Sequence, residues 1–175
     1  MQASDIMTAS PVCVTPEDTA GRVAQLMAEH DCGCLPVVAA RGDGRVIGVI
    51  TDRDLAVRGL ARGKGPETPA RQLMTPDPCC CAPDADVREV ERLMSERQVR
   101  RIVVADADGR CVGIVAQADL AHAAELGRDV TDREVAMVVE AISGPGTRPV
   151  RASGRGAERG TGAGRSADAS QEWRL

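Results

Sequence analysis

Apolar residues recur along the chain with two spacings, and the change from one to the other predicts helices and strands. Positions three or four residues apart, typical of one face of a helix, are Ala20, Val23, Ala24 and Met27. LPVVA and VIGVI then form continuous apolar runs on either side of a DGR turn, which predicts two strands. A VCV strand ahead of a helix capped by Thr15, and a last helix from about Asp52, complete a strand, helix, strand, strand, helix unit.

The second half of the chain repeats this pattern. When Met7 is laid over Met74, Leu26-Met27 faces Leu93-Met94, and after the shift falls by two residues in the turn around Ala40, GVITDRDL (residues 48–55) faces GIVAQADL (residues 113–120). Several motifs repeated in the same order indicate a duplicated structural unit. We therefore expect an α/β (α+β) fold with motif one over residues 1–63, a linker over 64–71 and motif two over 72–126.

The chain continues beyond the second copy with one more helical pattern. Thr131 and Glu134 have the spacing of a capping box, and one apolar stripe follows: Val135, Val138, Val139 and Ile142. We expect a C-terminal helix within residues 127–143 that packs on the body or on a second subunit. Residues 144–175 are rich in Gly, Arg, Ser and Ala, which predicts a disordered tail.

Composition narrows the classes of function. Of 175 residues, 43% are hydrophobic, yet Phe and Tyr are absent and Trp occurs once, so aromatic stacking on single-stranded nucleic acid is not available. The net charge of −4 also disfavours a nucleic-acid partner. MQASDIMTAS lacks the regions of a signal peptide, and no apolar run reaches the roughly eighteen residues that span a bilayer. A cytoplasmic protein without a nucleic-acid or membrane partner is expected.

The repeated motifs resemble a tandem pair of CBS domains, the regulatory module named after cystathionine β-synthase. The resemblance rests on IMT and LMT near the start of the copies, on LPVV and RRIVVAD, and on GVITDRDL and GIVAQADL, and it covers about residues 4–125. It implies two motifs packed about a pseudo-two-fold axis, with clefts that bind adenosine-containing ligands such as AMP, ADP, ATP or S-adenosylmethionine. Standalone pairs of this kind also occur among bacterial stress- and dormancy-response proteins.

The resemblance assigns the first cleft to Thr51 and Asp54. The Thr51 hydroxyl and a helix N-terminus would receive phosphate oxygens, and the Asp54 carboxylate would accept hydrogen bonds from the ribose hydroxyls. Arg100 and Arg101 are the basic pair that would meet the phosphates. The family's first strands cross over, which would place residues 75–80, beginning with Thr75, beside Asp54.

The second cleft is expected to be the weaker one. Asp119 repeats the ribose carboxylate, but Ala116 stands where the first copy has Thr51, so the hydroxyl is missing. The crossover would bring residues 8–13, beginning with Thr8, to this side. The alternative is that Asp54 and Asp119 only cap helices and that the arginines belong to a solvated surface.

Seven cysteines raise the alternatives of metal binding and redox sensing. The metal-ligand candidates are His30, Cys32 and Cys34. The repeat, however, sets three cysteines opposite valines, where Cys behaves as a small hydrophobe: Cys32, Cys79 and Cys81. We therefore predict no metal site and no required cofactor. Cys13 and Cys80 occupy equivalent positions and are candidates for a close approach across the pseudo-symmetry.

No catalytic motif is present: the sequence has no HExxH, P-loop, GxGxxG or nucleophile elbow, so an enzyme is not expected. The leading hypothesis is a noncatalytic regulatory CBS pair that senses an adenosine-containing ligand and signals by a conformational or oligomeric change. The alternatives are a ligand-free interaction protein of a stress or dormancy response, and a thiol or metal sensor. A homodimer is expected, together with an unknown protein partner.

Overall fold

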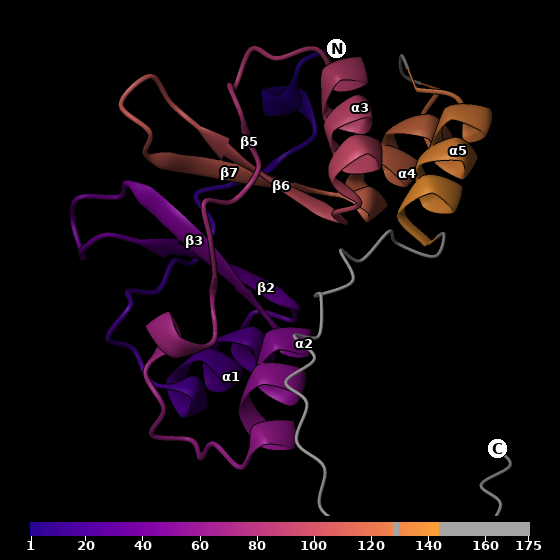
Figure 1. Cartoon of the computed structure of the whole chain (residues 1–175). Coiled ribbons are helices and arrows are strands. Elements are labelled where there is room, and N and C mark those ends of the chain that lie inside the picture. Colours follow the sequence, from indigo (N-terminus) through magenta and orange to yellow (C-terminus); the bar gives the residue numbers. More distant parts are fainter. Residues whose placement is uncertain (128–129, 144–175) are drawn as a thin grey trace, which may run out of the picture.

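A computed structural model describes residues 1–127 and 130–143 of the chain. It shows two β-sheets, one above the other in Figure 1, with helices on their outer sides. The expected α/β architecture of two related motifs is confirmed. The tail predicted at 144–175 lies outside the described residues.

The first sheet has three strands in the order β2-β3-β4. They are β2 (Cys34–Val38), β3 (Val46–Thr51) and β4 (Thr75–Pro76), and both pairings are antiparallel. Helix α1 (Ala20–Glu29) packs beside β2. Helix α2 (Asp52–Asp54) continues into the π-helical turn η2 (Leu55–Gly59), which contacts α1, and then into the short η3 (Leu60–Arg62).

Helix α1 begins later than its sequence predicts. Its N-cap is Thr19, whose side chain accepts a hydrogen bond from the Arg22 N–H at 3.2 Å. Thr15 instead closes a turn with Asp18, because its N–H and hydroxyl both donate to the Asp18 carboxylate, at 2.7 and 2.9 Å. The prediction of Thr15 as the cap was therefore wrong by one turn.

The second sheet has four strands in the order β1-β7-β6-β5. They are β1 (Thr8–Ala9), β5 (Cys80–Cys81), β6 (Arg101–Ala105) and β7 (Cys111–Ala116). Helices α3 (Val87–Arg97) and α4 (Gln117–Glu125) cover it, and the short helical turns η1 (Ala3–Asp5) and η4 (Ala70–Gln72) precede the first strand of each copy.

Each copy lends its first strand to the sheet of the other. Strand β1 of the first copy pairs with β7, and β4 of the second copy pairs with β3. The two hairpin turns also meet, since the Val46 N–H donates to the Gly109 carbonyl and the Cys111 N–H donates to the Gly44 carbonyl, both at 2.9 Å. The copies are therefore joined by backbone hydrogen bonds as well as by side chains.

This strand exchange explains the glycine that opens GVITDRDL and GIVAQADL. A Cβ atom at Gly48 would lie 2.9 Å from the backbone oxygen of Thr75 in β4, and one at Gly113 would overlap the Met7 side chain. Both glycines lie where the exchanged strand passes closest, so a side chain there would push the crossing segment away.

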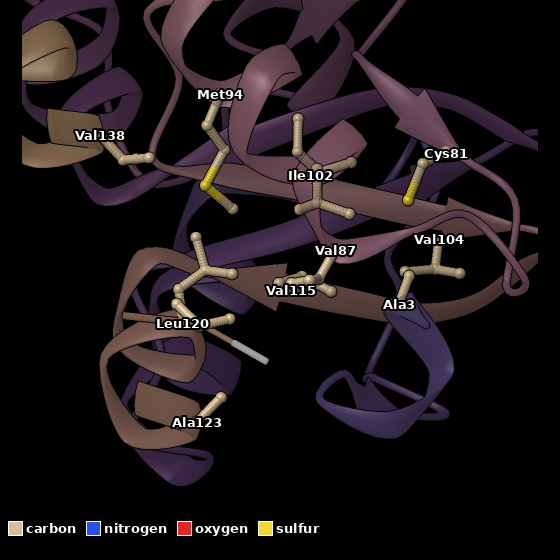
Figure 2. Packing of buried hydrophobic residues seen from close by; sticks show 12 residues of the cluster. Ala3, Cys81, Val87, Met94, Ile102, Val104, Val115, Leu120, Ala123 and Val138 are labelled. Carbon is tan, nitrogen blue, oxygen red and sulfur yellow. The ribbon is translucent and has the colours of Figure 1, made fainter. Parts of the chain in front are cut away.

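Two hydrophobic clusters form the core, one in each half. Figure 2 shows the cluster of the second half, with Met94, Ile102, Val115 and Leu120 pointing toward one another. The C-terminal helix α5 (Asp132–Ser143) adds Val138 to this cluster and packs on α3 and α4. Thr131 and Glu134 form the predicted capping interaction, with the Thr131 N–H and hydroxyl donating to the Glu134 carboxylate at 2.8 and 2.7 Å. The helix therefore packs on the body of the chain, which is one of the two placements expected from its apolar stripe.

Candidate ligand-binding clefts

A cavity of about 620 Å³ opens between the two motifs. Three segments that are distant in sequence form its walls: the junction of β3 and α2, the crossover after β4, and the turn that leads from α3 into β6. They bring together five of the residues predicted to bind a ligand: Thr51, Asp54, Thr75, Arg100 and Arg101.

Thr51 and Asp54 form a closed hydrogen-bonded unit at the start of α2. The Thr51 hydroxyl and N–H donate to Oδ2 of Asp54 at 2.6 and 3.0 Å, and the Asp54 N–H donates back to the Thr51 hydroxyl at 3.1 Å. Nε of Arg58 lies 3.3 Å from Oδ1 of Asp54. Each carboxylate oxygen has two lone pairs, so Oδ1 keeps acceptor capacity toward the cavity.

The opposite wall is basic. Arg97, Arg100 and Arg101 line the cavity, and none of their guanidinium groups is ion-paired within the described residues. Arg53, Asp52 and Asp77 line it as well, and Oδ2 of Asp52 and Nη2 of Arg101 both lie close to Gly33. The cavity therefore offers both unused cationic hydrogen-bond donors and carboxylate acceptors.

A second cavity of about 500 Å³ lies at the pseudo-symmetric position. It is lined by Asp119, Ala116 and the segment 8–12, so the crossover places Thr8 where the resemblance implied. Oδ2 of Asp119 accepts a hydrogen bond from the Ala116 N–H at 2.7 Å, and Ala116 has no hydroxyl to repeat the contact that Thr51 makes in the first copy. Burial raises the pKa of the Asp119 carboxyl above its ordinary value, although the Ala116 N–H, His122 and Arg101 act in the opposite direction.

Sequence reasoning missed Arg58 and Arg97, and it did not foresee the double position of Arg101. Arg101 lines both cavities, so one guanidinium group faces the two clefts from the shared wall. Arg58, one turn after Asp54, also donates from Nη1 to the carbonyls of Leu73 and Met74, at 3.0 and 2.9 Å. Its spacing of four residues from Asp54 was the only available signal, since both carbonyl partners are remote in sequence.

The three metal-ligand candidates all line the second cavity: His30, Cys32 and Cys34. Burial raises the pKa of the Cys34 thiol to about 11. Among residues 1–127 and 130–143, no three His, Cys, Asp or Glu side chains converge as metal ligands. In the same described residues, no helix combines the length and the apolarity required to cross a membrane.

Comparisons with known proteins agree with this architecture. Hypoxic response protein 1 of Mycobacterium tuberculosis is 38% identical over 144 residues, which cover 82% of this chain and 94% of that protein. Its crystal structure, solved with two coordinated zinc ions, superposes with a TM-score of 0.63 at 40% identity, covering 70% of this chain and 98% of that one.

Two further solved structures carry adenosine compounds. CBSX2 in complex with AMP matches with a TM-score of 0.63 at 27% identity, covering 73% of this chain and 98% of that chain. The CBS domain pair of protein MJ0100, in complex with 5-methylthioadenosine and S-adenosyl-L-methionine, matches with a TM-score of 0.64 at 26% identity, covering 70% and 98%.

The CBS domain family model matches the chain twice, over residues 3–59 and 70–126. The two matched segments correspond to the two copies seen in the sequence and to the two halves seen in the structure. The chain therefore belongs to the CBS domain family and carries the domain as a tandem pair.

Proposed function

We propose that this CBS pair is a noncatalytic regulatory module that binds an adenosine-containing ligand in the first cleft. The observation that carries the proposal is the gathering, around one cavity of about 620 Å³, of the Thr51–Asp54 unit and of arginines that have no ion pair within the described residues. The complexes of CBSX2 with AMP and of MJ0100 with S-adenosyl-L-methionine support it, since both proteins share this fold.

The ribose of the ligand would lie against Asp54. Its hydroxyls donate to the acceptor positions of Oδ1 that Arg58 leaves open, and a carboxylate is a stronger acceptor than a neutral oxygen. The cap itself stays intact, because Oδ2 continues to accept from Thr51. Arg58 also holds the carboxylate in place, with its Nε 3.3 Å from Oδ1 of Asp54.

The phosphates would lie toward the arginines. A guanidinium group binds phosphate oxygens through two parallel N–H donors, and Arg97, Arg100 and Arg101 have these donors available on one wall. A diphosphate or triphosphate would therefore gain more from this wall than a monophosphate. A cationic ligand such as S-adenosylmethionine would gain less.

The second cleft would bind more weakly. Ala116 stands in the place of the Thr51 hydroxyl, and the raised pKa of the Asp119 carboxyl makes its charged form less favourable. Because Arg101 lines both cavities, a phosphate that draws Arg101 into the first cleft removes a cation from the second. We therefore propose one dominant site per chain.

Binding would be transmitted through packing or self-association. A ligand shifts an equilibrium only by the difference in its affinity for the two states, and the first cleft is formed by both motifs, so its occupancy acts on their interface. Large apolar side chains remain exposed on the helical surfaces, among them Leu60 at 75%, Met137 at 61% and Leu126 at 55%. These side chains support a homodimer as the assembled form.

The test is calorimetric titration of the reduced protein with AMP, ADP, ATP, S-adenosylmethionine and NAD. Asp54→Asn preserves the size of the side chain and an acceptor for the Thr51 cap while it removes the charge, and Asp119→Asn is the matched control in the second cleft. We expect saturable binding that weakens by about tenfold or more in Asp54→Asn, the equivalent of roughly 1.4 kcal/mol, and that changes little in Asp119→Asn. Binding that survives both changes would place the ligand elsewhere.

A second function is favoured by one observation: Asp54 already has partners in Thr51 and Arg58, as expected of a purely structural cap. On this alternative the chain is a ligand-free interaction protein, and its similarity to Hypoxic response protein 1 suggests a stress response. No heat of binding across the whole panel, with a folded protein, would favour it. Metal analysis of the purified protein tests the third alternative, a metal sensor.

A further inference from the structure

The first cleft receives one side chain from outside the two CBS domains. Among residues 1–127 and 130–143, every residue that lines either cavity, with one exception, lies within the segments 3–59 and 70–126 matched by the family model. The exception is Ile142, which lies in the last turn of α5 and lines the first cavity. The first cleft is therefore formed by both CBS domains together with the C-terminal helix.

The last turn of α5 also contacts the turn from α3 into β6, which forms one wall of the first cavity. Nε2 of Gln98 donates a hydrogen bond to the Ala141 carbonyl at 3.4 Å, and Gln98 itself lines the cavity. Val99 and Ile142 both line the cavity, and both pack against the hydrophobic cluster of the second half. The end of α5 and this wall of the cleft therefore share contacts, so a displacement of the helix changes the cleft.

Few side chains of α5 hold it against the body of the chain. Of residues 132–143, Val138 alone is fully buried, and it joins the core cluster of the second half (Figure 2). Val135 and Ile142 are only partly buried. On α3, which α5 contacts, Glu91 is buried, and its Oε1 has no hydrogen-bond partner among the described residues. Because a buried polar group without a partner costs free energy, a further contact can stabilise the packed position of α5.

We propose that α5 is a ligand-responsive element of the first cleft: a nucleotide bound there holds α5 in its packed position, and release of α5 weakens nucleotide binding. The inference rests on the proposed function, because the ligand must occupy the first cleft. Ile142 belongs to the cavity wall only while α5 is packed, so a ligand that contacts this wall has a higher affinity for the packed state. The coupling is reciprocal: the factor by which the ligand stabilises packing equals the factor by which release of α5 weakens binding.

The coupling acts from one cleft only and reaches the outer surface. The described residues that line the second cavity include none of α5, so a ligand there should leave the helix unaffected. Met137 of α5 has 61% of its surface exposed, and occupancy of the first cleft decides how firmly this apolar side chain is held at the surface. The state of the cleft is thereby expressed on a helix outside both CBS domains, where a protein partner can detect it.

Hydrogen exchange measured by mass spectrometry tests the coupling in the full-length, reduced protein. Amide exchange of residues 132–142 is compared without nucleotide and with saturating AMP or ATP, after calorimetry has established whether each binds. We expect each nucleotide that binds to slow exchange in α5 by about fivefold or more, the lower end of ordinary coupling between two sites. Helix α1 lines neither cavity, so its exchange reports any general stabilisation of the protein, and exchange in α5 should slow by more than exchange in α1.

Two substitutions on α5 distinguish the coupling from a passive wall. Val138→Ala removes the buried anchor, which does not line the cavity, and we expect it to speed exchange in α5 and to weaken nucleotide binding by about twofold to fivefold. Met137→Ala, on the exposed face of the same helix, should change neither quantity.

The outcomes separate this inference from the proposed function. If a nucleotide binds and exchange in wild-type α5 slows no more than exchange in α1, the coupling is overturned while the binding function stands. Faster exchange in Val138→Ala with unchanged affinity overturns the coupling as well. If neither AMP nor ATP binds, the proposed function fails and the coupling fails with it. The wild-type comparison decides the outcome even if Val138→Ala fails to fold, which circular dichroism checks.

Discussion

Glu91 provides a direct test of the packing between α3 and α5. It lies on α3 with only 9% of its surface exposed, and Oε1 has no hydrogen-bond partner among the described residues. Burial, followed by the nearby Glu134 carboxylate of α5, raises the pKa of Glu91 above its ordinary value, while Arg88 acts in the opposite direction. At neutral pH a buried carboxylate without a partner should reduce the free energy of unfolding.

The magnitude follows from this missing partner. A buried polar group without a hydrogen bond costs about 1–3 kcal/mol, and methionine has nearly the same length without the charge. We therefore expect Glu91→Met to raise the free energy of unfolding by about 1–3 kcal/mol at neutral pH. For a chain of this size the midpoint temperature should rise by about 2–4 °C for each kcal/mol gained.

The pH dependence has a definite sign. Since the pKa of Glu91 is higher in the folded state, the folded protein holds this proton to higher pH than the unfolded chain does. The resulting stability is fully present below the unfolded pKa and is lost as pH rises through the folded pKa. The advantage of Glu91→Met should therefore be smallest in acid and should grow as pH rises toward neutrality.

Urea unfolding followed by circular dichroism, at several pH values between acid and neutral, measures this effect. The matched control is Glu96→Met on the exposed side of the same helix, where Glu96 pairs with Arg92 at 2.8 Å. Loss of an exposed pair of this kind should cost at most about 0.5 kcal/mol. The reasoning is refuted if Glu91→Met is no more stable than the wild type at neutral pH, or if its advantage does not change with pH.

The remaining predictions concern the crossing segments. Gly48→Ala should destabilise the protein by about 1–3 kcal/mol through overpacking, because the new Cβ would lie 2.9 Å from the Thr75 carbonyl oxygen. The control is Gly65→Ala, whose new Cβ would have nothing within 4 Å and should be neutral or slightly stabilising in the same urea experiment. Arg58→Ala should lower the free energy of unfolding by about 1–3 kcal/mol, since it removes donors to two backbone carbonyls. A decrease of less than about 0.5 kcal/mol would show that Arg58 does not link η2 to the segment before β4. Thr131→Ala should cost about 1 kcal/mol and increase hydrogen exchange in α5, and unchanged exchange would show that the cap does not hold this helix.

Much of the local structure was predictable from sequence. The helical spacing in residues 20–27, the apolar runs on either side of DGR and the capping pair at Thr131 all correspond to elements in the structure. The error at Thr15 has a local cause as well: Thr15 and Thr19 both satisfy the cap pattern, and Asp18 binds the first of them. Two candidate caps four residues apart cannot be distinguished by composition.

The candidate site was predictable to a smaller extent. The repeat and its resemblance to CBS pairs indicated Thr51, Asp54 and the Arg100–Arg101 pair, and the structure places them around one cavity. Their role in binding remains a prediction. The contribution of Arg58 to the Asp54 carboxylate and to the Leu73 carbonyl was not visible, because one of these contacts spans fifteen residues.

Repetition and periodicity are properties of neighbouring residues, so the sequence alone was enough for the duplicated unit, its helices and strands, and the family. Contacts between distant segments depend on how the two copies exchange their first strands, and only the tertiary structure shows which residues this exchange brings together. The exchange sets Arg101 between both cavities and requires Gly48 and Gly113 at the crossings. Helical spacing places Glu91 on the same face of α3 as Val87, Val90 and Met94, and the packing of α5 on α3, which only the tertiary structure shows, accompanies its burial.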